Sequence, residues 1–290
     1  MNILDVHTHG IGGFDTRTTS KENILKIAGI QGSRGVTEIV LTVYPSSIVT
    51  MRGNMRAIKE AMEAQRSAAG LPGSEAKILG IHLEGPFLNP LKCGSLDAGS
   101  FLEPGGYMLG KLVDGFGDII KIITVSPELA GAPSLIKDIT GRGIIASMGH
   151  SDATYAEAET GYNSGARGIT HIFNAMRGIH HREPGLAGFG LMNQDVYIEV
   201  IADPFHLAKK IIEFIFSVKD PEKIMIVSDS VKDTDLGSSP RGIINECGRL
   251  LGGSMTSHES AGRLIALGLS DITVSKALYD NPREYLRRLT

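Results

Sequence analysis

The sequence predicts an α/β protein folded as a closed (β/α)8 barrel of the TIM type. Short apolar runs alternate with segments of helical character along the whole chain, and the alternation occurs eight times. An open, doubly wound sheet is the alternative. That fold should carry a glycine-rich phosphate-binding loop after the first strand, and the run HTHG at 7–10 matches such a loop poorly. With 290 residues and no recognisable linker, the chain is expected to form one domain over residues 1–290.

Each expected strand is an apolar run that stops at a glycine or a polar residue, as buried parallel strands do. In chain order, the strands are expected at 3–6, 38–43, 77–83, 119–125, 143–148, 168–170, 197–201 and 224–227. The helices are expected at 21–33, 49–69, 133–140, 154–163 and 208–217, followed by two helices that extend to Leu289. Thr19 and Ser20 supply a cap signal for the first helix, and the second helix has a mixed charged and apolar face.

Three stretches are expected to lie outside these elements. The stretch 85–106 is rich in glycine and proline, a second one occupies 173–190, and a short turn-rich piece covers 243–253. Loops as long as the first two are usually functional or mobile when they occur inside a compact domain.

Charge and composition exclude several classes of partner. The formal net charge of −3 and the lack of a basic block argue against nucleic acid. No apolar run reaches membrane-spanning length, and the first residues lack the layout of a signal peptide. Cys93 and Cys247 make neither a disulfide framework nor a zinc ribbon. The sequence therefore predicts a cytoplasmic protein that binds neither nucleic acid nor a membrane.

Glu84 ends the third expected strand, and the glycine and proline that follow it stop that strand. In a barrel of this type, residues at the C-terminal ends of the strands carry the chemistry. A carboxylate buried there without a partner costs on the order of several kcal/mol, so it usually needs a cation. The alternative for Glu84 taken alone is a residue that only caps the next loop.

Histidines and an aspartate end other expected strands. His7 and His9 lie at the end of the first strand, His150 at the fifth, His171 at the sixth and Asp229 at the eighth. Alternate residues of a strand point to the same face, so His7 and His9 should face the barrel mouth together. Imidazoles combined with carboxylates suit a borderline divalent metal such as zinc, iron or manganese.

These ligands predict one or two divalent ions per chain. In the two-ion arrangement, His7 and His9 hold one ion with Asp229, His150 and His171 hold the other, and Glu84 bridges them. An N-cap of the next helix is the alternative for His150, and a structural carboxylate is the alternative for Asp229. A metal with an open coordination position lowers the pKa of its bound water to about 7. Asp229 could take the proton from that water and return it to a leaving amine.

Several stretches of the chain resemble a known family closely. They are HLEGPFLNP at 82–90, VSPE at 125–128, GHS at 149–151, THIFNAM at 170–176, REPG at 182–185, ADPFH at 202–206 and VSD at 227–229. In this order they resemble the amidohydrolase superfamily and, within it, the N-acetylglucosamine-6-phosphate deacetylase family. The resemblance covers nearly the whole chain.

The resemblance implies metal-dependent hydrolysis of the N-acetyl amide of an amino-sugar phosphate, with release of acetate. It implies that Glu84, His150 and His171 are metal ligands and that Asp229 is the catalytic acid and base. Members of the family that carry a His-x-His on the first strand can hold two ions, and the HTH run at 7–9 groups this chain with them.

The resemblance also implies four contacts with the substrate. Asn174 and Ala175 would contact it through side chain or backbone, and His206 would bind the sugar. Arg182 would bind the sugar phosphate, in the family usually across a dimer interface, so a homodimer is expected. A guanidinium group suits this role because it can donate two parallel hydrogen bonds to a phosphate.

The chain departs from the family pattern in three ways. Leu96 stands where family members usually have a histidine that contacts the acetyl carbonyl, and Pro204 replaces a glycine. Most members carry a β-sandwich built from both chain ends, and this chain is expected to be a shortened form without it. Leu96 and Pro204 favour a second hypothesis, a related amidohydrolase that acts on another amide, lactam or N-acyl substrate. A third is a non-catalytic barrel that binds a sugar phosphate, against which the complete ligand set argues.

Overall fold

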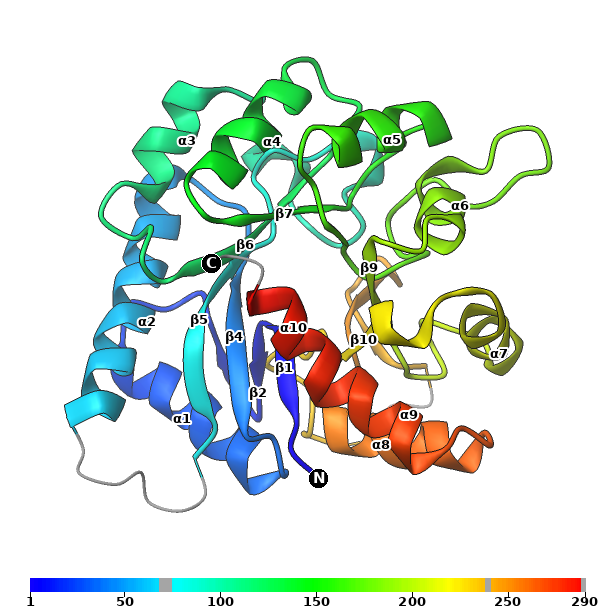
Figure 1. Cartoon of the computed structure of the whole chain (residues 1–290). Coiled ribbons are helices and arrows are strands. Elements are labelled where there is room, and N and C mark those ends of the chain that lie inside the picture. Colours follow the sequence, from blue (N-terminus) through cyan, green and yellow to red (C-terminus); the bar gives the residue numbers. More distant parts are fainter. Residues whose placement is uncertain (68–74, 238–240, 288–290) are drawn as a thin grey trace.

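The computed structural model describes residues 1–67, 75–237 and 241–287, and its eight-stranded parallel sheet curves into a nearly closed barrel (Figure 1). The strands are β1 (Leu4–Thr8), β4 (Glu38–Val43), β5 (Lys77–Leu83), β6 (Ile120–Val125), β7 (Ile145–Met148), β8 (Gly168–Ile169), β9 (Tyr197–Ile201) and β10 (Ile224–Val227). They neighbour one another in chain order. A doubly wound sheet would instead reverse its order at a switch point, so the predicted (β/α)8 barrel is confirmed.

Helices cover the outside of the barrel (Figure 1). Following the strands, they are α1 (Lys21–Ser33), α2 (Ile48–Ser67), α3 (Gly106–Val113), α4 (Ala132–Gly141), α5 (Tyr155–Asn163), α6 (Gly185–Met192), α7 (Lys209–Val218) and α8 (Ser257–Ala266). The predicted cap of the first helix is present, because the Ser20 side chain accepts a hydrogen bond from the Asn23 backbone N–H. The predicted helix end at 68–69 and Leu289 lie outside the described residues. None of the described helices is long and apolar enough to cross a membrane.

Short strands extend the barrel at its loops. β1 continues to Thr8, beyond the predicted end at residue 6, and therefore includes His7. A small hairpin of β2 (Gly10–Ile11) and β3 (Phe14–Asp15) follows it. The turn-rich piece at 243–253 forms a second hairpin from β11 (Ile243–Ile244) and β12 (Leu250–Gly252).

The prediction of a loop over 173–190 is wrong at its end, because α6 begins at Gly185. Three glycines at 185, 188 and 190 gave this segment low helical propensity in the sequence. The fold needs small residues there, since a Cβ atom at Gly190 would come within 2.6 Å of the Ile169 side chain on β8. The stretch 85–106 is irregular as predicted, apart from the short 3-10 turns η1 (Pro90–Lys92) and η2 (Ala98–Ser100).

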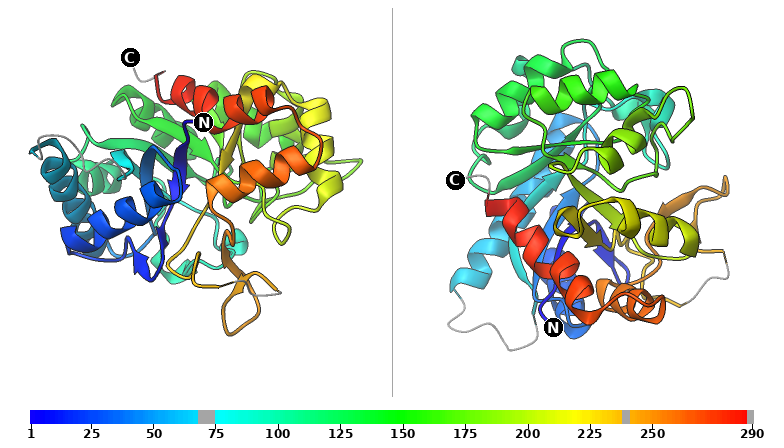
Figure 2. Two further views of the ribbon diagram at one scale, coloured as in Figure 1. Left: turned by 90° about the horizontal axis from the view of Figure 1, so that it is seen from below. Right: turned by 45° about the vertical axis from the view of Figure 1, so that its right-hand side comes forward.

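The C-terminal helices close the end of the barrel where the strands begin. α9 (Asp271–Ser275), the π-helical segment η4 (Lys276–Asp280) and α10 (Asn281–Arg287) lie there, with α10 crossing the barrel in red (Figure 1). Tyr285 of α10 is fully buried in the apolar cluster formed with β1, β9 and β10. Figure 2 shows the β11–β12 hairpin at the opposite end. That opposite end therefore holds the C-terminal ends of the strands, where barrel enzymes carry their chemistry.

The barrel closes at the seam between β1 and β10. Thr8 and Ser230 form an isolated parallel bridge there, and backbone and side-chain hydrogen bonds support it. The backbone N–H of Asp229 donates to the carbonyl of His7 at 2.9 Å. Behind the seam, the Gln31 side chain donates to the Thr8 and Ser230 hydroxyls at 3.0 and 3.1 Å. This closure places the end of the first strand beside the end of the last.

Candidate metal centre

All six predicted metal ligands meet at the C-terminal end of the barrel. They are His7 on β1, His9 just after it, Glu84 after β5, His150 after β7, His171 after β8 and Asp229 after β10. None of these residues is more than 9% exposed. Strands that lie far apart in the sequence thus deliver donor atoms to one buried point.

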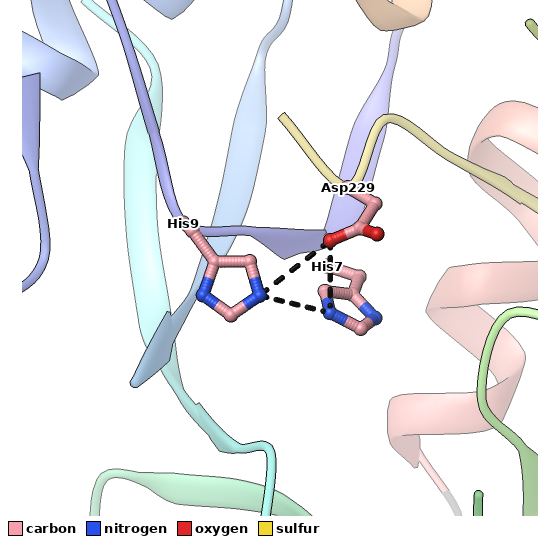
Figure 3. Close-up of side chains that lie close together, drawn as sticks. All are labelled: His7, His9 and Asp229. Carbon is pink, nitrogen blue, oxygen red and sulfur yellow. Dashed lines mark hydrogen bonds and ion pairs between the residues drawn. The ribbon is translucent and has the colours of Figure 1, made fainter. Parts of the chain in front are cut away.

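Three of the side chains, His7, His9 and Asp229, form the first ligand group and point toward one another in Figure 3. The two Nε2 atoms lie 3.3 Å apart, and Asp229 Oδ1 lies 3.4 Å from His7 Nε2 and 3.5 Å from His9 Nε2. Ligands about 2.1 Å from a tetrahedral zinc ion are separated by about 3.4 Å. The spacing therefore fits a shared metal ion.

Glu84, His150 and His171 form the second ligand group. Glu84 Oε1 lies 3.1 Å from His150 Nε2 and 3.0 Å from His171 Nε2, and the two imidazole nitrogens are 3.1 Å apart. The other carboxylate oxygen, Oε2, lies 3.2 Å from His9 Nε2 in the first group. Glu84 therefore faces both groups, the position that a bridging ligand requires.

Hydrogen bonds on the far side of two rings leave their Nε2 atoms free to bind a cation. His150 Nδ1 lies 2.9 Å from the carbonyl of Lys92, which can only accept, so Nδ1 carries the proton. His7 Nδ1 donates in the same way to Glu199 Oε2 at 2.8 Å. Such outer partners fix the tautomer and orientation of metal-binding histidines.

Stacking holds the ring of His9. The Tyr44 ring lies parallel to it with the centroids 3.8 Å apart. The guanidinium of Arg17 covers the Tyr44 ring at 4.3 Å. This three-layer stack limits rotation of the His9 imidazole without using its nitrogen atoms.

The electrostatics of the cluster are those of a metal-ligand set. Burial holds the pKa of His7 well below its usual range, so this imidazole is neutral. Burial and then the nearby charge of Glu84 raise the pKa of Asp229 well above its usual range. Burial also acts to raise the pKa of Glu84, but hydrogen bonds with His150, His171 and His9 hold it well below its usual range. A neutral imidazole beside crowded carboxylates provides donors that a divalent cation satisfies.

The backbone is left-handed at three of the six ligand positions. The φ angle is 48° at His150, 30° at His171 and 47° at Asp229. Residues with a Cβ atom rarely adopt this conformation, which costs about 1–3 kcal/mol each and concentrates at functional sites. Here these turns at the strand ends direct the side chains into the barrel mouth.

A network of motif residues supports His150 from behind. Glu128 accepts hydrogen bonds from the Asn89 side chain at 2.8 Å and from the Ser151 hydroxyl at 2.7 Å. The Ser126 hydroxyl donates to the His150 carbonyl at 2.6 Å. The runs HLEGPFLNP, VSPE and GHS thus meet in space and hold one ligand in place.

A cavity of about 560 Å³ opens above the two ligand groups. Its lining includes His9, all of the second ligand group, Asp229, and three of the predicted substrate contacts, Asn174, Ala175 and His206. This volume is typical of a small-molecule site. The ligand groups therefore lie at the floor of a cavity that a substrate can enter.

Comparisons with known proteins agree with the family resemblance of the sequence motifs. No protein-family model matches the chain. The chain is 34% identical over 233 residues to N-acetylglucosamine-6-phosphate deacetylase of Bacillus subtilis, covering 79% of this chain and 57% of that protein. It is 28% identical over 272 residues to N-acetylgalactosamine-6-phosphate deacetylase of Escherichia coli O157:H7, covering 94% of this chain and 68% of that protein.

A solved structure agrees over nearly the whole chain. It is that of a mutant N-acetyl-D-glucosamine-6-phosphate deacetylase from Mycobacterium smegmatis in complex with N-acetyl-D-glucosamine-6-phosphate, with a TM-score of 0.85 and 25% identity. The match covers 98% of this chain and 77% of that one. Over most of its length, this chain is therefore similar to deacetylases of N-acetylated hexosamine 6-phosphates, in sequence and in fold. The chain spans 57% of the length of the Bacillus subtilis protein and 68% of the length of the Escherichia coli protein.

Two predicted site residues do not line the cavity: His7, which is buried beside it in the first ligand group, and Arg182. Arg182 is exposed and does not line the cavity formed by the described residues of its own chain. Arg182 lies in the segment between β8 and α6, which projects from the barrel (Figure 1). Arg182 is therefore exposed on a segment that projects from the barrel.

Sequence reasoning missed Tyr44, Glu199 and Arg249. Tyr44 and Arg249 line the cavity, and Glu199 holds His7 from inside the barrel. A signal for Glu199 was present, because it is a carboxylate within the apolar run YIEVI of β9. The sequence offered no comparable signal for Arg249, which lies in a turn-rich hairpin.

Proposed function

We propose that this chain is a metal-dependent amidohydrolase that removes the acetyl group from an N-acetylated amino-sugar phosphate and releases acetate. The observation that carries the proposal is the convergence of six buried ligands, five of which line one cavity. Two relatives are named as deacetylases of N-acetylated hexosamine 6-phosphates, and one solved relative contains such a compound. The barrel itself carries the whole predicted ligand set.

The first and second ligand groups would each hold one divalent ion, with Glu84 between them. Zinc, iron and manganese all suit imidazole and carboxylate donors. An ion bound there supplies an activated water molecule and polarises the oxygen of an amide carbonyl.

Asp229 moves the proton in this proposal. Its carboxylate lines the cavity beside both first-strand histidines. Asp229 accepts a proton from the attacking water and donates it to the amide nitrogen as the carbon–nitrogen bond breaks. Acetate and a free amino sugar phosphate are then the products.

Three cavity residues orient the sugar. The Asn174 amide N–H group donates to the carbonyls of His171 and Ile172, which leaves its oxygen to accept from the substrate. Ala175 adjoins it with a left-handed backbone. His206 Nδ1 donates to Asp203 at 2.9 Å, so its Nε2 is available to a sugar hydroxyl.

Arg182 contacts the phosphate from a second copy of the chain in this proposal, which makes the active form a homodimer. Its outward position on the projecting segment supports that arrangement. Chemical crosslinking or light scattering of the purified protein tests the oligomeric state directly.

Leu96 favours a second candidate, a related amidohydrolase that acts on another amide, lactam or N-acyl substrate. Leu96 lines the cavity and cannot donate a hydrogen bond to an acetyl carbonyl. Loss of one such donor typically costs about 10²–10³ in rate.

Acetate release from phosphorylated and unphosphorylated N-acetyl hexosamines, measured with metal-loaded protein, tests the proposed function. Asp229→Asn should lower turnover at least ~10²-fold while substrate still binds. Asp118→Asn, a change to a surface carboxylate, should leave turnover intact. Normal turnover in the Asp229 variant would assign the proton transfer to another group. If the metal-loaded wild type releases no acetate, the second candidate is favoured. If the protein binds no metal at all, a non-catalytic barrel is favoured.

A further inference from the structure

Arg249 brings a cation to the cavity that holds the ligand groups. It lies in the turn between β11 and β12, at the barrel end where the strands finish (Figure 2). Its side chain lines the same cavity as Glu84 and Asp229. The cation and the metal ligands therefore belong to one chain and one cavity.

The turn that carries Arg249 is organised by Asn245. The Asn245 Oδ1 atom accepts from the backbone N–H of Cys247 at 3.0 Å and of Arg249 at 2.9 Å. The backbone N–H of Asn245 donates to the Arg249 carbonyl at 2.9 Å. Gly248 supplies the left-handed conformation between them, with φ at 75°. The base of the Arg249 side chain is thus fixed.

The guanidinium is also held from the other side of the cavity. Arg249 Nη1 donates to the Gly94 carbonyl at 3.0 Å. Gly94 lies directly against the metal centre, since a Cβ atom there would be 3.6 Å from His150 Cε1 and 3.4 Å from Ala175 Cβ. One loop residue therefore separates the guanidinium from a metal ligand and from a predicted substrate contact.

Most of this guanidinium is free to bind a ligand. A guanidinium has five N–H donors, and the two contacts of Arg249, with the Gly94 carbonyl and with the Cys93 sulfur at 3.9 Å, both use Nη1. Arg249 makes no ion pair with any carboxylate among residues 1–67, 75–237 and 241–287. Other arginines of the barrel do, namely Arg17, Arg34, Arg142, Arg177 and Arg283. An unpaired cation at the mouth of a cavity indicates an anionic ligand.

We propose that Arg249 binds the phosphate group of the substrate, from the same chain that carries the metal ligands. The inference rests on the proposed function, because it assumes that the acetyl end of the substrate lies at the ligand groups. The phosphate of an amino-sugar 6-phosphate is then one sugar ring away, toward the cavity mouth. Two parallel N–H groups of Arg249 match the oxygens of a phosphate monoester.

The test compares kcat/KM for N-acetylglucosamine 6-phosphate and for unphosphorylated N-acetylglucosamine in Arg249→Ala and Arg249→Lys. For the phosphorylated substrate, Arg249→Ala should lower kcat/KM about 10- to 100-fold, mainly through KM. For the unphosphorylated substrate the change should stay within about twofold, because no charge is lost from its contacts. Arg249→Lys should restore part of the loss, since it keeps the charge without the fork. Arg66→Ala on the outer surface of α2 removes the same charge as a control and should change neither value.

A purely structural role for Arg249 gives a different result. If the bond to Gly94 only holds the loop in place, Arg249→Ala should weaken both substrates equally, and that result overturns the proposal. Unchanged values for both substrates overturn it too and leave Arg182 as the phosphate ligand. If the wild type releases no acetate at all, the proposed function fails, and calorimetry with N-acetylglucosamine 6-phosphate decides the role of Arg249 independently. Equal affinity in wild type and Arg249→Ala would then overturn it.

Discussion

Replacing Glu199 with Gln should weaken metal binding by the first ligand group. Glu199 lies in the middle of β9 and is fully buried. Its Oε2 atom accepts hydrogen bonds from His7 Nδ1 at 2.8 Å and from the backbone N–H of His171 at 3.2 Å. This carboxylate therefore orients an imidazole of the first group and the main chain of the second.

The size of the effect follows from the loss of a charged acceptor behind a ligand. Gln keeps the shape of Glu199 and one acceptor oxygen, but it lacks the negative charge that favours the His7 N–H. Loss of such an outer partner usually lowers metal affinity 10- to 100-fold, which is about 1.4–2.7 kcal/mol. A hydrogen bond to a charged group contributes about 1.5–3 kcal/mol, so the two scales agree.

Competition with a chromophoric chelator measures this affinity in the wild type and in Glu199→Gln. Binding of one ion should weaken by that factor. The ion of the second group should be affected less, because Glu199 accepts from the His171 backbone N–H there, whereas in the first group it accepts from the His7 ring. Glu38→Gln is the matched control. Glu38 is 8% exposed and pairs with Arg283 at the start of β4, far from the histidines. Equal affinities in Glu199→Gln and wild type would refute the reasoning, and an equal loss in Glu38→Gln would trace the effect to general destabilisation.

Two further predictions concern the carboxylates around the site. Glu84→Gln should lower the content of both ions, measured by elemental analysis of the purified protein, because a neutral amide bridges two cations poorly; unchanged content would remove the bridging role. Burial acts to raise the pKa of Asp203, but hydrogen bonds from His206 and Ser254 lower it to about 2 from 3.8. The deprotonated form thus stabilises the fold by about 2 kcal/mol above pH 4, and this contribution is lost as the pH falls toward 2. In urea unfolding, the deficit of Asp203→Asn relative to wild type should shrink over that range, and a constant deficit would contradict the assignment.

The ligand set could be predicted because each of its members ends a strand. Parallel strands of a barrel finish at one rim, so residues spread from His7 to Asp229 must meet there. The spacing of His7 and His9 also carried direct information about a shared face. Their Nε2 atoms lie 3.3 Å apart, although β1 ends between them at Thr8. The alternation of apolar runs with segments of helical character likewise predicted the strands and most of the helices.

Contacts across the barrel interior could not be predicted in this way. Glu199 and His7 are 192 residues apart in the chain. They contact each other because their side chains, on β9 and β1, both point into the barrel interior. The residues around Glu199 in the run YIEVI do not predict that partner. The start of α6 was not predicted, for the opposite reason. Its glycines oppose helix formation locally, although Gly190 is needed for the close approach to Ile169. Helix propensity reflects only the local preference of the backbone, and in α6 packing against the sheet overrides that preference.

Leu96, one of the departures from the family pattern, and Arg249 lie on two segments that line the cavity. Leu96 lies in the loop after β5, and Arg249 in the hairpin after β10. These two segments contact each other through the bond from Arg249 to the Gly94 carbonyl and through the Ser95 hydroxyl, which lies 3.5 Å from the Leu251 carbonyl. The metal side of the cavity keeps every ligand expected from the family. With leucine in place of a donor, a bound ion would have to polarise the carbonyl, and the first-strand histidines are among the residues that would hold such an ion. We therefore expect this chain to share the family's chemistry and to differ in how it selects the substrate.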